Sequence, residues 1–172
     1  LVITGETKNI KINDSLNIPL TFFTVNVRND SSKVSINTGA NQAVEKANLN
    51  ALVLTYGDGV EIEFDPSSFS VNGKAWTIDE AGVLKFRRNT AASGQLIITE
   101  GEQKILLKTK QSTKGNWNDL KVELTKVNLG DFAPFFMPNN RLEGLLSGNI
   151  LVEDPTNDLK IFINLFCEDQ RL

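Results

Sequence analysis

Apolar and polar residues alternate with a period of two through most of the chain. The clearest stretch is residues 60–64, where Val60, Ile62 and Phe64 are separated by two glutamates. Because successive side chains of a β-strand point to opposite faces, this pattern predicts a strand with one apolar and one polar face. Further strands are predicted at residues 1–4, 18–27, 49–56, 69–71, 74–78, 96–99, 105–108, 120–124 and 159–166. The protein is therefore expected to be mainly β.

Short turns separate these strands. Asn72-Gly73 lies between two alternating runs and predicts a hairpin, because a two-residue type I′ turn needs positive φ at both central positions. Clusters of Gly, Asn, Asp and Ser predict further turns at residues 57–59, 92–94, 100–102, 113–116 and 154–157. Short strands joined by short turns favour a meandering antiparallel sheet over parallel βαβ units.

Helical patterns are scarce, so at most one or two short helices are expected. One is predicted at residues 129–136, ended by Pro138, and a second candidate lies at residues 40–46. The chain then divides into a β-rich meander over residues 1–117 and a β repeat over residues 118–172. The second part holds the helix and a strand bounded by glycines.

The strands are of two kinds. Some alternate strictly, as expected for a sheet with one solvated face, whereas residues 51–54 and 96–98 are apolar on both faces and need cover on both sides. Two architectures accommodate this mixture. One is a curved antiparallel meander, a trough similar to a β-taco with an apolar concave side. The other is a β-sandwich with a closed core.

Charge excludes one class of partner. Eighteen basic and 21 acidic residues leave a net charge of −3, and the two signs are interspersed. This distribution does not predict nucleic-acid binding, which needs a basic face. The adjacent Arg87 and Arg88 are expected to be solvated. The sequence contains no run of about 18 apolar residues, so no membrane-spanning helix is predicted in it.

Residue types exclude much of the usual catalytic chemistry. The chain has no histidine and a single cysteine, so histidine-activated nucleophiles, histidine metal sites and internal disulfides are all excluded. Cys167 continues the apolar phase of Ile161, Ile163 and Leu165 and is expected to be buried. We predict no catalytic residue, no metal site and no cofactor.

Acidic residues are densest at Asp58, Glu61, Glu63 and Asp65. A pair of carboxylates can perform glycosidase-type acid–base catalysis, so a hydrolase is one hypothesis. Glu61 and Glu63, however, lie opposite an apolar face at a spacing of two. That spacing is typical of the solvated face of a strand, and we expect both side chains to be solvated.

Strand patterns lie close to both ends of the sequence, at residues 1–4 and 159–166. A natural chain seldom begins and ends within such patterns. We therefore expect an interior piece of a longer exported protein, with any signal peptide or membrane anchor outside the piece.

The C-terminal third carries a recognisable pattern. A strand at residues 120–124 is followed by Leu-Gly-Asp-Phe-Ala-Pro-Phe-Phe, then by Leu-Glu-Gly-Leu-Leu-Ser-Gly and a further strand up to residue 152. This order resembles the repeat unit of TamB-type translocation and assembly module proteins, which are related to AsmA-like proteins. Residues 66–78 are similar to a segment of such proteins from Bacteroidetes-like bacteria. The resemblance covers residues 118–172 and, more loosely, residues 58–90.

The resemblance implies a fold, a location and partners. Members of this family are anchored in the inner membrane, cross the periplasm and cooperate with an Omp85-type barrel in the outer membrane. They are associated with outer-membrane protein assembly, protein secretion and phospholipid transport, and their repeats form a β-taco with a hydrophobic groove. By resemblance, this chain is a non-enzymatic periplasmic conduit segment. Its partners would be phospholipid acyl chains or outer-membrane protein clients, and regions outside it would meet the barrel.

A groove of this kind needs only a contiguous apolar lining, because burying an acyl chain contributes about 0.8 kcal/mol per CH₂. The apolar phase of the predicted strands selects the candidate lining residues. They are Val60, Ile62, Phe64, Phe69, Val71, Trp76, Ile78, Leu120, Val122 and Leu124. The alternative function is a secreted β-sandwich module for ligand binding or adhesion, whose apolar faces would close on each other.

Overall fold

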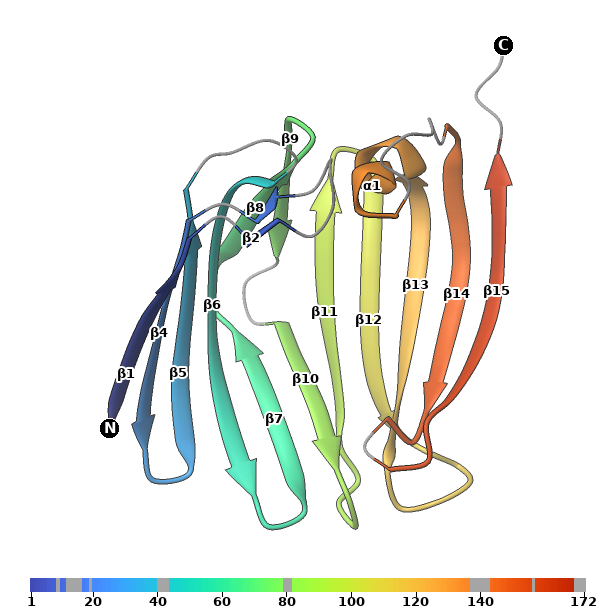
Figure 1. Cartoon of the computed structure of the whole chain (residues 1–172). Coiled ribbons are helices and arrows are strands. Elements are labelled where there is room, and N and C mark those ends of the chain that lie inside the picture. Colours follow the sequence, from blue (N-terminus) through green and yellow to red (C-terminus); the bar gives the residue numbers. More distant parts are fainter. Residues whose placement is uncertain are drawn as a thin grey trace.

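The computed structural model describes residues 1–8, 10–11, 17–18, 20–39, 44–78, 82–136, 143–155 and 157–168. Within these residues the chain forms one 13-stranded antiparallel sheet, a separate two-stranded sheet and one short helix (Figure 1). The strands of the large sheet are β1 Val2–Thr7, β4 Thr21–Arg28, β5 Ser31–Thr38, β6 Val44–Tyr56, β7 Gly59–Phe64, β8 Ser67–Val71, β9 Lys74–Ile78, β10 Gly82–Arg87, β11 Ser93–Glu100, β12 Gln103–Gln111, β13 Asn118–Asn128, β14 Leu145–Glu153 and β15 Lys160–Glu168. The predicted antiparallel meander is confirmed.

Neighbours in the sequence are mostly neighbours in the sheet. The strand order is β1-β4-β5-β6-β7-β10-β11-β12-β13-β14-β15. The β8–β9 hairpin occupies a second place between β6 and β11, because β6 pairs with β7 along one half and with β8 along the other. In the same way β11 pairs with β10 and with β9. The small sheet consists of β2 Ile10–Lys11 and β3 Asn17–Ile18.

Local sequence signals set the hairpin and the helix. Asn72 has a φ of 49° and Gly73 a φ of 76°, so the β8–β9 hairpin has the predicted turn with two positive φ angles. The helix α1 spans Leu129–Phe136, the predicted range. The second helix candidate was wrong at residues 44–46, which start β6 and pair with β8, and its residues 40–43 lie outside the described part. A strand partner therefore overrides the weak helical pattern there.

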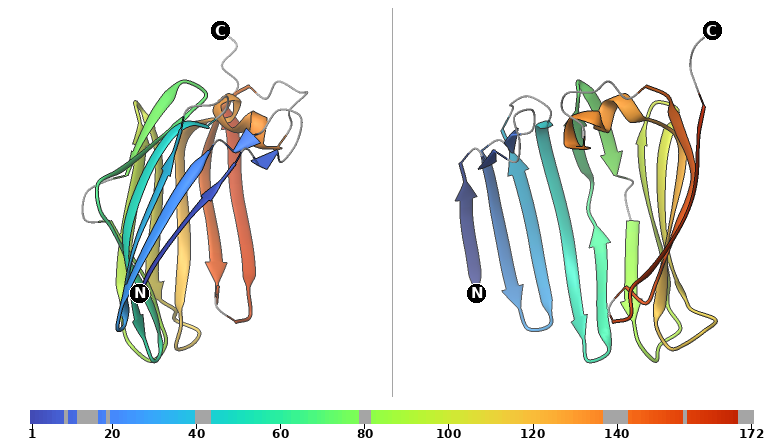
Figure 2. Two further views of the ribbon diagram at one scale, coloured as in Figure 1. Left: turned by 60° about the vertical axis from the view of Figure 1, so that its left-hand side comes forward. Right: turned by 45° about the vertical axis from the view of Figure 1, so that its right-hand side comes forward.

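The sheet bends into a trough. Figure 2 shows that the strands at both ends, β1 and β15, curve towards the same side of the middle strands, and that α1 lies on that concave side at one end. The sheet continues through the predicted boundary at residues 117–118, because β12 and β13 pair directly. The large sheet is a single layer, and the two-stranded β2–β3 sheet is too small to close the described residues into a sandwich. Strands with two apolar faces, such as residues 51–54, therefore have no second sheet on their convex side, where Leu52 lies beside Lys33 and Glu63.

The strand pairing is weakest where β10 meets β11. These two strands share one residue pair, Val83 with Gln95, and other N–H groups of β10 donate to side chains instead. The N–H of Lys85 donates to Thr109 Oγ1 at 2.9 Å, and the N–H of Arg87 donates to Asn118 Oδ1 at 2.7 Å. Because both acceptors are almost fully buried, β10 is held against β12 and β13 by polar groups shielded from water.

A glycine permits this approach. A Cβ atom at Gly94 in β11 would lie 2.3 Å from the carbonyl oxygen of Val83 in β10. A larger residue would force the two backbones apart. The geometry of the bend therefore depends on one small residue and on two side-chain acceptors.

The fully buried core is small and lies near α1. Trp76 is 0% exposed, and its ring is 6.2 Å from the parallel ring of Phe69 and 5.5 Å from the ring of Phe132 in α1. A neighbouring cluster consists of Ile78, Leu84 and Leu96. Neither cluster includes a side chain from β1, β4, β5 or β15. The core therefore closes the middle of the trough at one end and leaves its outer strands open.

Candidate functional site

The strand register places all ten candidate lining residues on one face of the sheet. Trp76 pairs with Phe69, Ile78 pairs with Ile98, and Ile98 pairs with Ile105, which pairs with Leu124. Directly opposite residues in an antiparallel pair point to the same face, so this chain of pairs links the β8–β9 hairpin to β13. On the other side, β6 links β7 to the same face, because its Ala51 pairs with Phe64 and its Ala47 pairs with Phe69. This face is the concave one, because α1 lies on the concave side of the sheet and its Phe132 packs on Trp76.

Burial divides the ten residues into two groups. Val71, Trp76 and Ile78 are buried by the protein itself and form the closed core at the α1 end. The other seven are partly exposed and form part of the surface of the trough. They are Val60, Ile62, Phe64, Phe69, Leu120, Val122 and Leu124.

The apolar face is wider than these ten residues. In β4 and β5, Val25 pairs with Val34 and Phe23 with Ile36, and the same register continues the face through β6 to Ile62. In β14 and β15, Ile150 pairs with Ile163, next to Val122. The sequence signal for these residues was the same period of two, which runs through residues 21–28 and 159–166. The concave surface is therefore apolar from one edge of the sheet to the other.

Charged residues on this face lie at the α1 end. The strand register places Lys74 and Glu100 on the apolar face, and both side chains have polar partners next to α1. The Lys74 ammonium is 2.9 Å from the carboxylate of Asp131 in α1, which is 2% exposed. Gln103 donates from Nε2 to both Glu100 and Asp131. These contacts hold α1 across the end of the trough.

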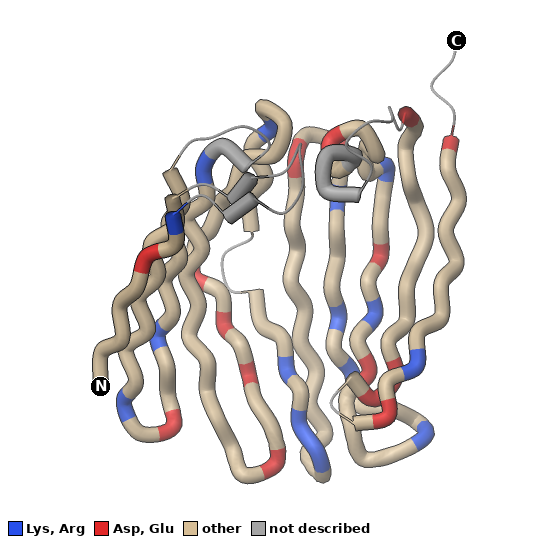
Figure 3. Tube along the Cα trace, in the orientation of Figure 1, with Lys and Arg blue, Asp and Glu red and all other residues tan. Residues whose placement is uncertain are grey.

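A polar cluster lies at the opposite end, where β7 begins and β10 and β14 end. Charged residues of both signs gather around this end of the sheet (Figure 3). The Arg87 guanidinium contacts Asp58 Oδ1 at 2.6 Å and Glu61 Oε1 at 3.1 Å, and lies 3.8 Å from the centre of the Tyr56 ring. Lys85 contacts the second oxygen of Glu61 at 3.1 Å. We call Tyr56, Asp58, Glu61, Lys85 and Arg87 the Arg87 cluster.

Two expectations were wrong at this cluster. Glu61 was expected to be solvated but is 9% exposed, and the Arg87 side chain is only 13% exposed. The reason is cross-strand register, because Lys85 lies directly opposite Glu61 and covers it, with Arg87 two residues further along β10. Glu63 on the same face is partly exposed.

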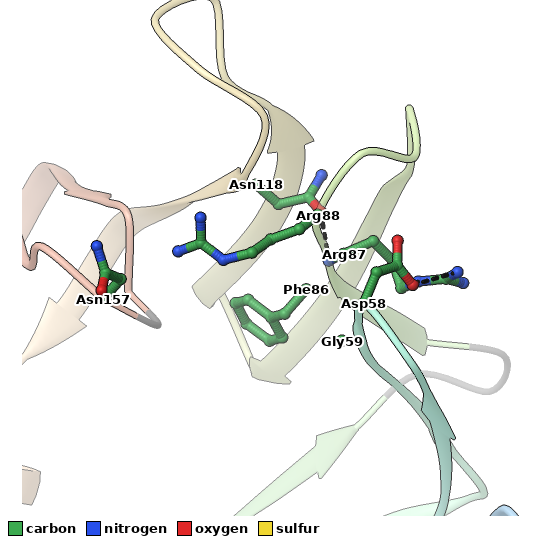
Figure 4. A pocket seen from close by; sticks show the side chains of 7 residues that line it. All are labelled: Asp58, Gly59, Phe86, Arg87, Arg88, Asn118 and Asn157. Atoms are coloured by element: carbon green, nitrogen blue, oxygen red, sulfur yellow. Dashed lines mark hydrogen bonds and ion pairs between the residues drawn. The ribbon is translucent and has the colours of Figure 1, made fainter.

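A pocket of about 310 Å³ adjoins the cluster. It is lined by Asp58, Gly59, Phe86, Arg87, Arg88, Asn118 and Asn157 (Figure 4). Arg88 crosses it and contacts Asp154 at 2.7 Å, in the turn between β14 and β15. The pocket therefore lies where three loops meet, and its charges are already paired by the protein.

Asp58 is held in its ionised form. The hydrogen bond from Arg87 holds the pKa of the Asp58 carboxyl below its usual range, and the hydroxyl of Thr90, which donates at 2.9 Å, adds to the effect. A general acid needs a raised pKa instead. Asp58 and Glu61 share one guanidinium as ion-pair partners, an arrangement that does not support the hydrolase hypothesis.

This pKa shift predicts how stability depends on pH. Because the pKa of Asp58 is lower in the folded state than its usual value of 3.8, its contribution is present above about pH 4 and is lost as pH falls through the folded pKa. Replacing Asp58 with asparagine should therefore flatten the fall in the free energy of unfolding below about pH 4. Urea unfolding between about pH 2 and 6 measures both curves.

Asp30→Asn, in the exposed turn between β4 and β5, provides the control for this experiment. We expect it to keep the pH dependence of the parent. Parallel curves for the parent and Asp58→Asn would contradict the role of Arg87.

Cys167 was expected to be buried and is an exposed free thiol. The face to which it points was predicted correctly, since Cys167 pairs with Leu146 on the concave side. It is exposed because β15 is the last strand of the sheet and no strand lies beyond it in the described residues.

Two kinds of feature are absent from the described residues. They contain no group of three or more Cys, Asp or Glu side chains placed to hold a metal ion. None of their helices is both long and apolar enough to cross a membrane.

The chain was compared with known protein families, curated proteins and solved structures. No protein-family model, curated protein or solved structure matches the chain.

Proposed function

We propose that this chain is a non-enzymatic segment of a periplasmic conduit of the TamB type, which carries apolar cargo on its concave face. The cargo would be phospholipid acyl chains or extended segments of outer-membrane protein clients. In the full-length protein, an inner-membrane anchor and a contact with an Omp85-type barrel would lie outside this chain. The resemblance of residues 118–172 to the repeat of that family supports the proposal.

The observation that carries the proposal is the continuity of the apolar concave face. In a closed sandwich such a face would pack against a second sheet, and its side chains would be buried. Here Ile62, Val122 and their neighbours on the face are only partly buried, and the described residues supply no second sheet large enough to cover them. Contiguous apolar surface that stays partly exposed in this way is typical of a site that binds another apolar surface.

An acyl chain or an extended polypeptide fits such a face. Each CH₂ group that leaves water for an apolar surface contributes about 0.8 kcal/mol, so binding requires length and continuity more than specific polar contacts. The alternative of an adhesion or ligand-binding sandwich has no comparable support, because the sheet is one curved layer.

Photo-crosslinking in cells tests the proposal with two adjacent positions of β7. A photoreactive phenylalanine derivative at Ile62 faces the concave side, whereas the same derivative at Glu63 faces the convex side. We expect phospholipid or outer-membrane protein adducts at position 62, several-fold above those at position 63. Mass spectrometry of the adducts distinguishes the two cargo classes. Equal capture at the two positions, or more at position 63, would rule the proposal out.

A further inference from the structure

Lys74 and Asp131 form an ion pair between β9 and α1 that is largely shielded from water. Asp131 is 2% exposed, and the Lys74 ammonium lies 2.9 Å from its Oδ2 atom. Trp76 lies two residues from Lys74 on the same face of β9, and its ring packs on Phe132, the residue after Asp131 in the helix. An amine and a carboxyl group are therefore held in contact beside a fully buried aromatic side chain.

We propose that Lys74 and Asp131 join in a covalent amide, which cross-links β9 to α1 without any enzyme or cofactor. The ammonium first passes one proton to Oδ1 of the carboxylate, and the neutral amine then attacks the carboxyl carbon. A bond forms between Nζ and Cγ while Oδ2 takes up the negative charge. A second proton moves from the nitrogen to Oδ1, the Cγ–Oδ1 bond breaks, and Oδ1 leaves as water. This condensation needs no oxidant, reductant or other reactant.

The contact has the proximity that such a reaction needs. A carboxyl C–O bond is about 1.2 Å long, so the Lys74 nitrogen lies within about 4 Å of the Asp131 carboxyl carbon, close to a near-attack geometry. Groups held in this way react as if at an effective concentration of about 10⁵ M or more, which outweighs the tendency of water to hydrolyse an amide. The Lys74 side chain is 35% exposed, so the released water can leave.

The product also removes an energetic cost of the ion pair. Keeping two charges away from water is unfavourable unless their mutual attraction compensates, and the amide replaces both charges with one neutral group. The Oδ1 atom that leaves has no hydrogen-bond partner among the described residues, since both contacts of the Asp131 carboxylate are made by Oδ2. Loss of this oxygen therefore breaks no existing hydrogen bond.

Gln103 supplies the group that stabilises charge during the reaction. Its Nε2 donates at 3.0 Å to Asp131 Oδ2, the oxygen on which negative charge develops when the nitrogen attacks. Gln103 is 7% exposed and its amide is fixed at both ends. Its Oε1 accepts the N–H of Asn128 at 2.7 Å, and its Nε2 also donates to Glu100 at 2.6 Å. Gln103 is therefore the catalytic residue of this self-modification.

Other pairs of lysine and carboxylate in the described residues lack part of this arrangement. Lys126 and Glu102 have side chains that are 51% and 82% exposed, so water surrounds both groups. Glu61 in the Arg87 cluster is shielded, but its two oxygens contact the cations Lys85 and Arg87 instead of a neutral amide donor. Burial, contact with an amine and a fixed neutral donor coincide at Asp131.

The amide would hold α1 permanently across the end of the trough. It closes a covalent ring through residues 74–131, which restricts the unfolded chain in the way that a disulfide does. This inference goes beyond the proposed function and does not depend on it, because the reaction involves only side chains at the α1 end and no cargo.

Mass spectrometry of the denatured, intact protein tests the proposal. During prolonged incubation at neutral pH, the parent should become lighter than its sequence by one water molecule. Trypsin should no longer cleave after Lys74, and the digest should contain a branched peptide that carries both Lys74 and Asp131. A parent that keeps the full mass of its sequence would overturn the proposal.

Lys74→Arg is the matched control. Arginine keeps the ion pair with Asp131, but its guanidinium stays protonated and cannot attack the carboxyl carbon. We expect this variant to keep its full mass and to be cleaved by trypsin after residue 74. It also identifies the source of the lost water, because Asp58-Gly59 can lose water by forming a cyclic imide. Equal loss of water from the parent and from Lys74→Arg would refute the cross-link.

Gln103→Met tests the catalytic role. Methionine has a similar length and fills the same buried site, but it cannot donate to Asp131. We expect the rate of water loss to fall about 100-fold, because the developing negative charge loses its donor. Gln111→Met, at the opposite end of β12, should react at the rate of the parent. Circular dichroism checks the fold of both variants, and equal rates for both would overturn the role of Gln103.

Discussion

Replacing Trp76 with alanine should lower the free energy of unfolding by about 4 kcal/mol, the largest loss we expect from any single side chain. Trp76 is fully buried between Phe69 of the neighbouring strand and Phe132 of α1. It lies in one cluster with Val127 of β13 and Phe132 of α1, and so joins the β8–β9 hairpin to both elements. Its loss leaves a cavity that the surrounding sheet cannot close, because neighbouring strands are tied by their hydrogen-bond ladders.

One feature reduces the expected loss. Trp76 Nε1 is buried without a hydrogen-bond partner in the described residues, and alanine removes that unpaired donor. This relief is worth about 1 kcal/mol and is included in the value above. Urea unfolding followed by circular dichroism measures the change.

Trp117→Ala is the matched control. Trp117 is partly exposed in the turn between β12 and β13, where its Nε1 donates to Asp119 at 2.8 Å. We expect a loss of about 1 kcal/mol there. Equal losses for the two variants would show that α1 is not packed on Trp76 as described.

Adding a single methyl group at Gly94 should destabilise the protein by about 3 kcal/mol. In Gly94→Ala the new carbon would lie 2.3 Å from the carbonyl oxygen of Val83 and 3.2 Å from Thr109 Oγ1. Neither neighbour can move away without loss. The Val83 oxygen belongs to the backbone of β10, and Thr109 Oγ1 accepts the hydrogen bond from the N–H of Lys85. Moving β10 away would leave that N–H unpaired and open the bend.

Gly57→Ala provides the comparison, since nothing lies within 4 Å of a Cβ atom at Gly57. This variant should change the free energy of unfolding by less than about 1 kcal/mol. Thermal unfolding of both variants measures the difference. A loss at Gly94 no larger than that at Gly57 would mean that β10 does not cross β11 so closely.

Local patterns predicted the elements of this fold well. The period of two in residues 60–64 predicted both a strand and the face that each side chain occupies. Asn72-Gly73 predicted a hairpin because the requirement for positive φ is local to two residues. The helix at Leu129–Phe136 was also predicted from local pattern, and all ten candidate lining residues share one face. Such features depend on residues close together in the sequence.

Features that depend on distant residues were not predicted. Arg87 contacts Asp58, 29 residues earlier, and Arg88 contacts Asp154, 66 residues later, so neither ion pair has a local signal. Cys167 shows the same limit in another form. Its apolar phase indicates the face to which it points, but only the edge position of β15 determines that the thiol is exposed.

The single-layer sheet also has a consequence for how such a protein can change in length. Most strands of the sheet pack chiefly against their two neighbours, so the architecture is close to a one-dimensional array. A hairpin consists of two strands of opposite direction. When one hairpin is inserted or deleted, the next strand therefore still starts at the same end of the trough and runs in the same direction. Among homologous chains, the span of the concave surface can therefore vary by whole hairpins in β1–β5 or β12–β15. The segment from β6 to β11 cannot vary in this way, because the β7–β10 pair and the β8–β9 hairpin both lie between β6 and β11.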